Sequence, residues 1–411
     1  MKTLKDLPSE FQLVTEFDNP YLSTPLNVNA HFHTPYSFSA FDSIHEIFEK
    51  AEEEKIGVLG INDFITTFGY VEFNDLANRY QKFPLFCIEF MGLMKNEQDK
   101  GIRINDPNNP GRIYLCGKGL AFPEQFSESS RILLQRVFDE SQRQTKTMTE
   151  KLNVYLKGIN AQFELHFEKI KNSYSKGMVR ERHIAKALRI EILKHYPDKE
   201  NFNKFLSILF PNNQIQFDKN YTTVLDNELR SKLLKKGGIA FVEEDENAFL
   251  SLDQIKQIVL DAKGIPFYPV LLDDKNGNYT EFEADPEKLF IELSKRKIYA
   301  VEFIPGRNDI KHLKKYLQFF SEKGFIITMG SEHNTPDRAP LILFSRDQSP
   351  LEKELKAINY YGACIIAAHQ FFIAKGKEGY LTKEGFPKME KQDEFITLGN
   401  AVIRHFTFKK S

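Results

Sequence analysis

The sequence contains no tryptophan and few cysteines. Its 411 residues include 37 phenylalanines, so an aromatic core has to be built mainly from Phe. Cys87, Cys116 and Cys364 are far apart and show no CxxC spacing. Without that spacing a zinc knuckle is excluded, and three separated thiols are typical of buried free cysteines in a reducing compartment.

Long apolar runs and an excess of charge of one sign are also missing. No run of about 18 apolar residues occurs, so we expect no transmembrane helix. The segment from Met1 to Pro20 lacks the basic-then-apolar pattern of a signal peptide, which predicts a cytoplasmic protein. The formal net charge is -1. This balance argues against general nucleic-acid binding, although it does not exclude a small basic pocket.

What the sequence does contain is an alternation of short apolar segments with helical patterns. Strands are expected at Leu26–Ala30, Val58–Ile61, Leu85–Ile88, Gly238–Val242, Pro266–Leu271, Ala300–Ile304 and Phe325–Met329. Helices are expected at Ser43–Lys55, Tyr70–Tyr80, Leu252–Ala262, Pro286–Lys295, Ile310–Ser321 and Glu352–Tyr361. This rhythm predicts an α/β protein with a parallel sheet or barrel.

The rhythm is interrupted in the middle of the chain. There, apolar residues recur at three-, four- and seven-residue spacings, which indicates long amphipathic helices. We therefore expect residues 24–121 and 236–345 to form one barrel-like unit. Residues 122–235 would be a helical insertion, and residues 346–411 a C-terminal extension packing on the barrel. The sequence makes no prediction about oligomeric state.

Polar residues follow several of the predicted strands. His31 and His33 end the first strand, Asp63 follows the second, Glu89 the third, and Glu332-His333 the last. Two imidazoles at positions i and i+2 of a strand point to the same face and can chelate one metal ion. Taken alone, the pair could equally be two partly buried histidines. Four such clusters at strand ends are hard to explain by packing, because carboxylates are rarely buried without a partner.

These motifs, in their order along the chain, resemble those of the PHP (polymerase and histidinol phosphatase) family. The resembling segments are His31-Phe32-His33 with Ser37, Gly60-Ile61-Asn62-Asp63-Phe64, Ile88-Glu89, Arg182-His183-Ile184-Ala185, Gly264-Ile265-Pro266-Phe267-Tyr268-Pro269 and Gly330-Ser331-Glu332-His333-Asn334. The resemblance implies a distorted, TIM-like (β/α)7 barrel with a helical insertion and a metal centre at the C-terminal mouth.

The resemblance also implies a ligand set, from which this sequence departs. His31, His33, Glu89 and Glu332 occupy ligand positions of the family and can all still bind metal, and His183 is a further candidate. Phe64, Tyr268 and Asn334 stand where the family has histidines. Phenylalanine cannot bind a metal, and asparagine offers only a neutral carbonyl. We therefore expect a reduced centre with one divalent ion, either Zn, Mn or Fe.

Other residues are candidates for catalysis. Asp63 or His333 could act as the general acid or base, and Arg112, Arg182 and Arg307 could neutralise a phosphate group. Each has an ordinary alternative. His183 could be a packed structural histidine, and arginines such as Arg180 and Arg182 most often lie on a solvated helix face.

Two functions are compatible with this pattern. The first is a metal-dependent hydrolase, a phosphoesterase acting on a small phosphomonoester, a nucleotide or an oligonucleotide end. The alternative is a non-catalytic ligand- or metal-binding protein on a degenerate PHP scaffold. The retained ligands favour the first function, and the substituted ligand positions favour the second.

Overall fold

The computed structural model describes residues 3–17, 24–37, 41–211, 222–272, 277–333 and 339–408. Within these residues seven strands form one sheet in the order of the sequence. They are β1 (Asn27–Phe32), β2 (Ile56–Phe64), β3 (Phe83–Leu93), β4 (Arg112–Lys118), β5 (Ile265–Val270), β6 (Ala300–Phe303) and β7 (Ile326–Met329). The expected α/β architecture is confirmed at this level.

The sheet curls into a nearly closed barrel. Past the end of β7, the backbone N–H groups of Ser331 and Glu332 donate to the carbonyl of His31, at 3.1 and 3.0 Å. Lower down, Asn359 accepts from the Met329 N–H and donates to the Val28 carbonyl, so its side chain bridges β7 and β1. Gly330 has to be glycine, because a Cβ there would lie 2.2 Å from the Cβ of His31.

One strand runs against the other six. β4 pairs antiparallel with both β3 and β5, whereas the remaining neighbours pair in parallel. β4 was not expected from the sequence, because a turn-rich segment precedes its apolar residues. Its direction places Arg112 opposite Leu93 at the C-terminal end of β3. The beginning of β4 therefore shares the barrel mouth with the ends of the parallel strands.

Helices cover the outside of the barrel. These are α2 (Ile44–Glu53), α3 (Tyr70–Tyr80), α10 (Leu252–Asp261), α11 (Pro286–Lys295) and α12 (Ile310–Glu322). Several begin at a side-chain cap: Ser43, Ser251, Asp285 and Asp309 each accept a hydrogen bond from a first-turn N–H. Their buried apolar faces share one core with the outward side chains of the strands.

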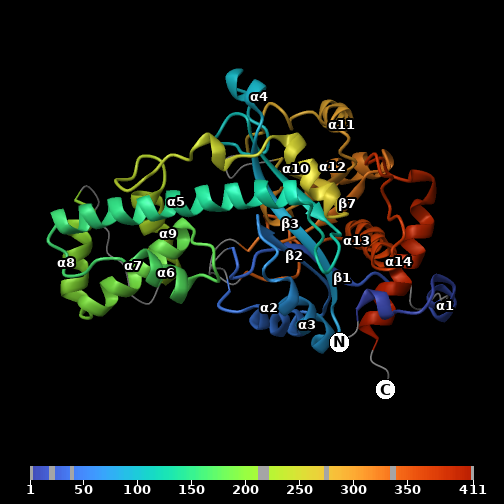
Figure 1. Ribbon diagram of the computed structural model, residues 1–411, viewed down its shortest axis with the longest axis horizontal. Helices are drawn as coiled ribbons and strands as arrows, with labels where there is room; N and C mark the ends of the chain where they lie inside the picture. The colour runs from blue at the N-terminus through green and yellow to red at the C-terminus, as the bar shows by residue number, and fades with distance from the viewer. Residues whose placement is uncertain are drawn as a thin grey trace.

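The helices of residues 128–234, which follow β4, project to one side of the barrel (Figure 1). They are α5 (Glu128–Gly158), α6 (Phe167–Tyr174), α7 (Glu181–His195), α8 (Lys199–Leu209), α9 (Thr222–Leu229) and the π-helical turn η3 (Arg230–Leu234). They share an apolar core of their own, which includes Leu152, Ile184 and Leu188. The strand expected at Gly238–Val242 was wrong. Its Ala240 N–H donates to the Leu233 carbonyl, which keeps this segment in turns against the insertion.

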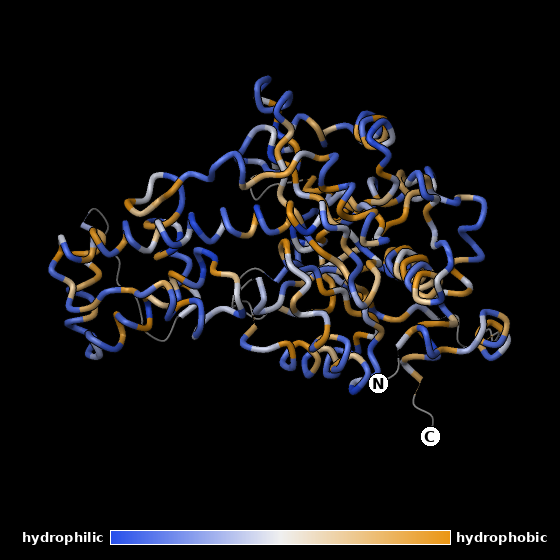
Figure 2. The backbone as a smooth tube through the Cα atoms, in the orientation of Figure 1, coloured by the Kyte–Doolittle hydropathy of each residue, from blue (hydrophilic) through white to orange (hydrophobic). Residues whose placement is uncertain are grey.

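The C-terminal helices α13 (Lys353–Ala374) and α14 (Gln392–Thr407), with α1 (Glu10–Glu16), pack at the other side of the barrel (Figure 1). By length and composition α13 is apolar enough to cross a membrane, but 67% of its most apolar window is buried inside the protein. Figure 2 shows apolar segments concentrated in this region and in the barrel, and mostly hydrophilic ones along α5. The hydropathy of α13 is thus explained by its contacts with β7 and β1.

The remaining elements are short. They are η1 (Leu4–Asp6), α4 (Lys95–Asp99), η4 (Glu246–Ala248), η5 (Pro305–Arg307) and η6 (Met389–Lys391).

Candidate metal centre

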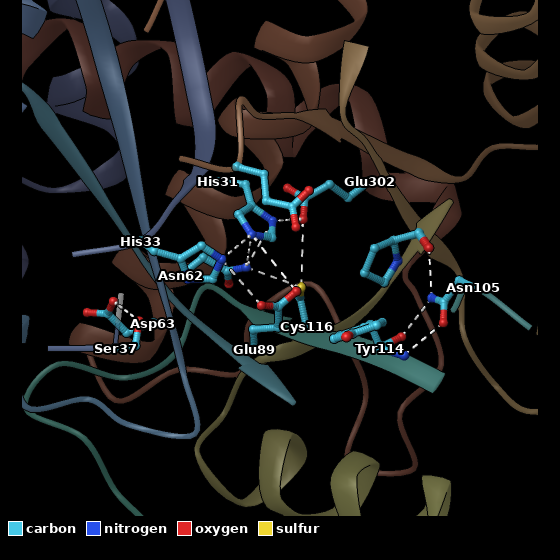
Figure 3. A network of polar contacts seen from close by, with 12 residues as sticks. His31, His33, Ser37, Asn62, Asp63, Glu89, Asn105, Tyr114, Cys116 and Glu302 are labelled. Atoms are coloured by element: carbon cyan, nitrogen blue, oxygen red, sulfur yellow. Dashed lines mark hydrogen bonds and ion pairs between the residues drawn. The ribbon is translucent and has the colours of Figure 1, made fainter. Parts of the chain in front are cut away.

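Three side chains predicted as metal ligands meet inside the barrel mouth (Figure 3). His31 is in β1, His33 follows that strand, and Glu89 is in β3. The Nε2 atoms of His31 and His33 are 3.4 Å apart. Glu89 places Oε2 at 3.4 Å from His33 Nε2 and Oε1 at 4.0 Å from His31 Nε2. All three side chains are buried, so they form a compact set of ligand atoms that water barely reaches.

The spacing of these atoms fits a tetrahedral ion. Metal–ligand bonds of about 2.0–2.1 Å require ligand atoms about 3.3–3.4 Å apart at tetrahedral angles. The Nε2–Nε2 separation and the separation of Glu89 Oε2 from His33 Nε2 have this value, whereas the 4.0 Å distance to His31 belongs to the other carboxylate oxygen, Oε1. The Glu89 carboxylate therefore has to turn before one oxygen suits both imidazoles. Two imidazoles and one carboxylate suit Zn, Mn or Fe. The residues present therefore fit a divalent metal ion.

The electrostatics of this group follow from burial. Burial raises the pKa of Glu89 to about 7, against the opposing effect of the His31 charge. Burial, followed by the charges of His31 and Arg180, holds the pKa of His33 well below its usual range. Burial also acts against a charge on His31, but the Glu302 carboxylate outweighs it and raises the pKa of that imidazole. A neutral His33 has a lone pair for a metal without first losing a proton.

A buried ion pair lies behind His31. Glu302 of β6 contacts His31 Nδ1 through Oε2 at 2.6 Å, and Lys118 of β4 through Oε1 at 2.6 Å. The Lys118 ammonium also donates to the Ala30 carbonyl at 2.7 Å. Both side chains of the pair are fully buried. A carboxylate that accepts from one ring nitrogen of a histidine fixes the ring and leaves the other nitrogen for a metal.

Glu302 also belongs to a second group of ligand atoms, with His31 and Cys116. Its 2.6 Å contact with His31 is a hydrogen-bond distance and is too short for two ligands of one ion. Cys116 Sγ is 3.7 Å from Glu302 and accepts from the Asn62 amide at 3.3 Å. Burial raises the pKa of the Cys116 thiol well above its ordinary value, so no thiolate is ready to bind metal. We therefore assign the ion to the Nε2 side of His31.

The fourth expected ligand, Glu332, lies apart from this group. Its carboxylate forms an ion pair with the Arg307 guanidinium at 2.7 Å. The two residues follow β7 and β6 and were expected to act separately, Glu332 on the metal and Arg307 on a phosphate. The charge of Glu332 nevertheless acts on Glu89 and, after burial, helps to raise its pKa.

The other expected arginines lie at the junction of barrel and insertion. Arg112 forms an ion pair with Glu244 at 3.2 Å and stacks on Phe249. Arg182 is near the start of α7, where burial and the Arg230 charge lower its pKa to about 10. It still carries its charge at neutral pH, and that charge contributes to the low pKa of His33. The Arg182 charge thus acts on the centre, whereas Arg112 is held by Glu244 and Phe249.

Three expected site residues make other contacts. Asp63 accepts from the Thr34 N–H, the Thr34 hydroxyl and the Ser37 hydroxyl, at 2.8, 2.5 and 2.5 Å, and so organises the loop after β1. The ring nitrogens of His333 contact Ser331 Oγ and the Ala339 carbonyl, both at 2.7 Å. His183 accepts from the Arg180 N–H at 2.9 Å within the buried start of α7. The structure brings none of the three into the metal group.

Two of the substituted ligand positions are also fully described. Phe64 ends β2 opposite Glu89, and the Arg180 guanidinium lies over its ring at 4.5 Å. Tyr268 in β5 is fully buried and lies against Phe282. Burial and the nearby Glu283 charge raise its pKa well above the ordinary value, so the phenol is no metal ligand at neutral pH. Asn334 lies outside the described residues.

The buried carboxyl group of Glu283, near Tyr268, should make the stability of the protein depend on pH. Burial raises the pKa of Glu283 to about 8. The folded protein keeps this group protonated up to that pH, whereas the unfolded chain ionises near the ordinary value of 4.5. The free energy of unfolding should therefore fall as pH rises between these values, by about 1.4 kcal/mol for each step of one in pH and thus several kcal/mol in all. Glu283→Gln, which stays neutral, should flatten this decline in urea denaturation curves.

The matched control is Glu281→Gln. Hydrogen bonds from Arg103 lower the pKa of Glu281 to about 2. Replacing Glu281 should therefore lower the free energy of unfolding above that pH. The fall in the free energy of unfolding between the ordinary pKa of a glutamate and pH 8 should remain. If Glu283→Gln keeps the full decline of the wild-type protein, Glu283 is ionised in the folded state and the expectation is wrong.

Sequence reasoning missed Glu302, Lys118, Asn62 and Cys116 as parts of the site. A signal for Glu302 was present, because it is the single charge inside an otherwise apolar strand, whereas its partner Lys118 ends β4, a strand that was not expected. A charged residue in a buried strand needs a partner of opposite charge. The sequence does not say which partner, since the two residues are 184 positions apart and meet only in the closed barrel.

No family model matches the chain. No curated protein matches it either. Among solved structures, an amidohydrolase from Chromobacterium violaceum with bound sulfate and no metal is 16% identical, covers 81% of this chain and 96% of its own, and has a TM-score of 0.48. A protein assigned as a metal-dependent phosphoesterase, from Bifidobacterium adolescentis, is 14% identical, covers 79% and 95%, and has a TM-score of 0.49. These are distant likenesses, and the activity has to be argued from the site.

Proposed function

We propose that this protein is a metal-dependent hydrolase that cleaves a small phosphomonoester, a nucleotide or an oligonucleotide end. The observation that carries the proposal is the buried group of His31, His33 and Glu89, whose ligand atoms all lie within 4.8 Å of one another and whose two Nε2 atoms are 3.4 Å apart. The resemblance of the ordered motifs to the PHP family supports the same reaction class. A divalent ion held there would lower the pKa of a bound water and supply a nucleophile at neutral pH.

The surrounding side chains prepare the centre for an anionic substrate. Glu302 fixes the orientation of the His31 ring, and Lys118 holds Glu302 in place. The charge of Arg182 acts on His33, and that of Arg307 acts on Glu89, although Arg307 is paired with Glu332. Cations around a partly buried centre can neutralise phosphate oxygens and exclude neutral esters. With Asp63 and His333 occupied by other contacts, these cations and Glu89 are the groups nearest the reaction.

The alternative is a non-catalytic ligand-binding protein. Two observations favour it. The buried phenol of Tyr268 stays protonated, so it is not a metal ligand at neutral pH. Arg307 and Glu332 pair with each other, although Arg307 was expected to bind an anion and Glu332 a metal.

One experiment separates the two functions. Protein purified without chelators should contain about one equivalent of Zn, Mn or Fe, because three protein ligands hold a single catalytic ion. It should hydrolyse 4-nitrophenyl phosphate or a nucleoside 5′-monophosphate, lose this activity to a chelator and regain it with added metal. Metal content is measured by mass spectrometry and phosphate release by colorimetry.

Two results would count against the enzyme. One equivalent of metal without hydrolysis of any tested monoester would support the binding protein. Two or three equivalents would show that residues other than those assigned here hold further ions.

A further inference from the structure

The strongest feature outside the three ligands is a cation that the insertion places beside them. The Arg180 guanidinium lies over the Phe64 ring at 4.5 Å, and Phe64 is the register partner of the ligand Glu89. The guanidinium also lines a cavity together with Phe64 and Tyr114. Arg180 thus stands on the Phe64 side of the metal group.

The position of Arg180 is fixed by local structure. It is the residue before α7, and its N–H donates to His183 Nδ1 at 2.9 Å. The preceding residue, Val179, exchanges two hydrogen bonds with the Gln142 side chain of α5, at 2.9 and 3.2 Å. The chain therefore enters the helix along one path. A cation–π contact with Phe64 then holds the guanidinium over the end of β2.

Arg180 shares a neighbouring carboxylate with two other cations. Glu181 is 3.9 Å from Arg180 Nε, and Lys235 and Arg230 contact the same carboxylate at 2.7 and 3.2 Å. The two closer cations compensate the charge of Glu181 without Arg180. Glu181 therefore keeps two cationic partners when Arg180 contacts an anion.

A cavity adjoins this arginine. Its volume is about 100 Å³, and its lining includes Phe64, Arg112, Tyr114, Arg180 and Lys235. Phe64 and Arg180 both line this cavity, and Phe64 is also the register partner of Glu89, so the cavity adjoins the metal group at the end of β2. The lining combines aromatic rings with three cations and two carboxylates, of which Glu244 pairs with Arg112 and Glu181 with Lys235. A cavity of this kind suits a small organic group attached to an anion.

We propose that Arg180 stabilises the departing oxygen of the substrate, whose alcohol part occupies the cavity beside Phe64. The inference rests on the proposed phosphoester hydrolysis and deepens it. A centre with one metal ion lacks the second cation that, in two-metal sites, stabilises the leaving oxygen. Arg180 supplies a permanent positive charge at that place. The side chain of Phe64, which cannot bind a metal, serves as the surface on which this cation rests.

The chemical step balances without any further reactant. The bond between water oxygen and phosphorus forms, and the bond between phosphorus and the alcohol oxygen breaks. The water gives up one proton, and the departing oxygen takes up one proton from solvent. Arg180 transfers no proton, because a guanidinium stays protonated in proteins. Its contribution is electrostatic and grows with the negative charge on the departing oxygen.

The dependence of the Arg180 contribution on the leaving group can be tested. Zinc-loaded wild-type protein, Arg180→Gln and Arg180→Lys are compared on a series of aryl phosphates and one alkyl phosphate. Arg180→Gln should lower kcat/KM by about 10-fold for the best leaving group and by about 10²–10³-fold for the poorest, the range seen when one transition-state donor is removed. Arg180→Lys should recover part of the loss. Arg143→Gln, on an exposed arginine of α5, is the matched control and should change nothing.

A second measurement does not depend on turnover. Calorimetric affinity for inorganic phosphate should fall about tenfold in Arg180→Gln, with and without zinc, while zinc content and melting temperature stay at wild-type values. A loss that is equal for every leaving group, or an unchanged phosphate affinity, would overturn the role given to Arg180. Failure of the proposed function itself would be visible in the wild-type protein, as absence of metal-dependent hydrolysis, and would overturn this inference with it.

Discussion

Replacing His31 with asparagine should abolish metal binding. His31 contributes Nε2 to the ligand group and uses Nδ1 to contact Glu302 at 2.6 Å, so it joins the metal position to the buried ion pair behind it. The shorter asparagine side chain cannot make both contacts. Loss of a residue that only orients a ligand already costs about 10–100-fold in metal affinity, so loss of this ligand should cost more than about 100-fold. Metal content and zinc titration calorimetry measure the effect.

The control for this variant is His312→Asn. His312 is half-exposed on α12 and lies 3.7 Å from Asp309, outside the barrel mouth. It should retain full metal content. Wild-type metal content in the His31 variant, in a protein with an unchanged melting temperature, would show that the ion is held elsewhere.

Replacing Lys118 with methionine should strongly destabilise the protein. Lys118 and Glu302 are both fully buried and 2.6 Å apart. Burial raises the pKa of Glu302, but the charges of Lys118 and His31 outweigh this effect and keep it below the ordinary value, so the pair is ionised. Removing one partner of a buried ion pair leaves an uncompensated charge and costs about 3–5 kcal/mol. Urea denaturation should show this loss in the free energy of unfolding.

The double variant Lys118→Met with Glu302→Leu tests the physical reason. It removes both charges, so it should be more stable than Lys118→Met alone even though it carries one more substitution. Its metal affinity should still fall, because His31 then lacks the carboxylate that orients its ring. Lys95→Met is the matched control. Lys95 pairs with Glu246, both side chains are exposed, and its loss should leave the free energy of unfolding almost unchanged. Equal stability of the single and double variants would contradict this account.

The His31 and Lys118 variants test different parts of one site. The metal ligands come from the segment between Asn27 and Leu93, whereas the ion pair joins β4 to β6 on the far side of the insertion in sequence. Loss of a ligand should remove metal and leave the fold intact. Loss of Lys118 should weaken the barrel itself, because β4 is the antiparallel strand that joins its two halves.

The sequence by itself determined the features that depend on neighbouring residues. The alternation of apolar segments and helical patterns predicted six of the seven strands and the helices between them, since both periods are read within a few residues. It also predicted that His31 and His33 share a face, because residues two apart in a strand do so whatever surrounds them. His31, His33 and Glu89 were predicted for the same reason, because they directly follow the predicted strands Leu26–Ala30 and Leu85–Ile88.

The tertiary structure alone decided how distant segments meet. The direction of β4 follows from its partners, and the apolar segment Gly238–Val242 became turns because Ala240 packs in the insertion. Glu332 pairs with Arg307, and Arg180 lies on Phe64, through closure of the barrel and docking of the insertion. Ion pairs and cation–π contacts depend on distance in space, and the spacing of residues along a chain does not set that distance. The pairing of buried charges with the metal ligands therefore depends on the closure of the seven strands around His31.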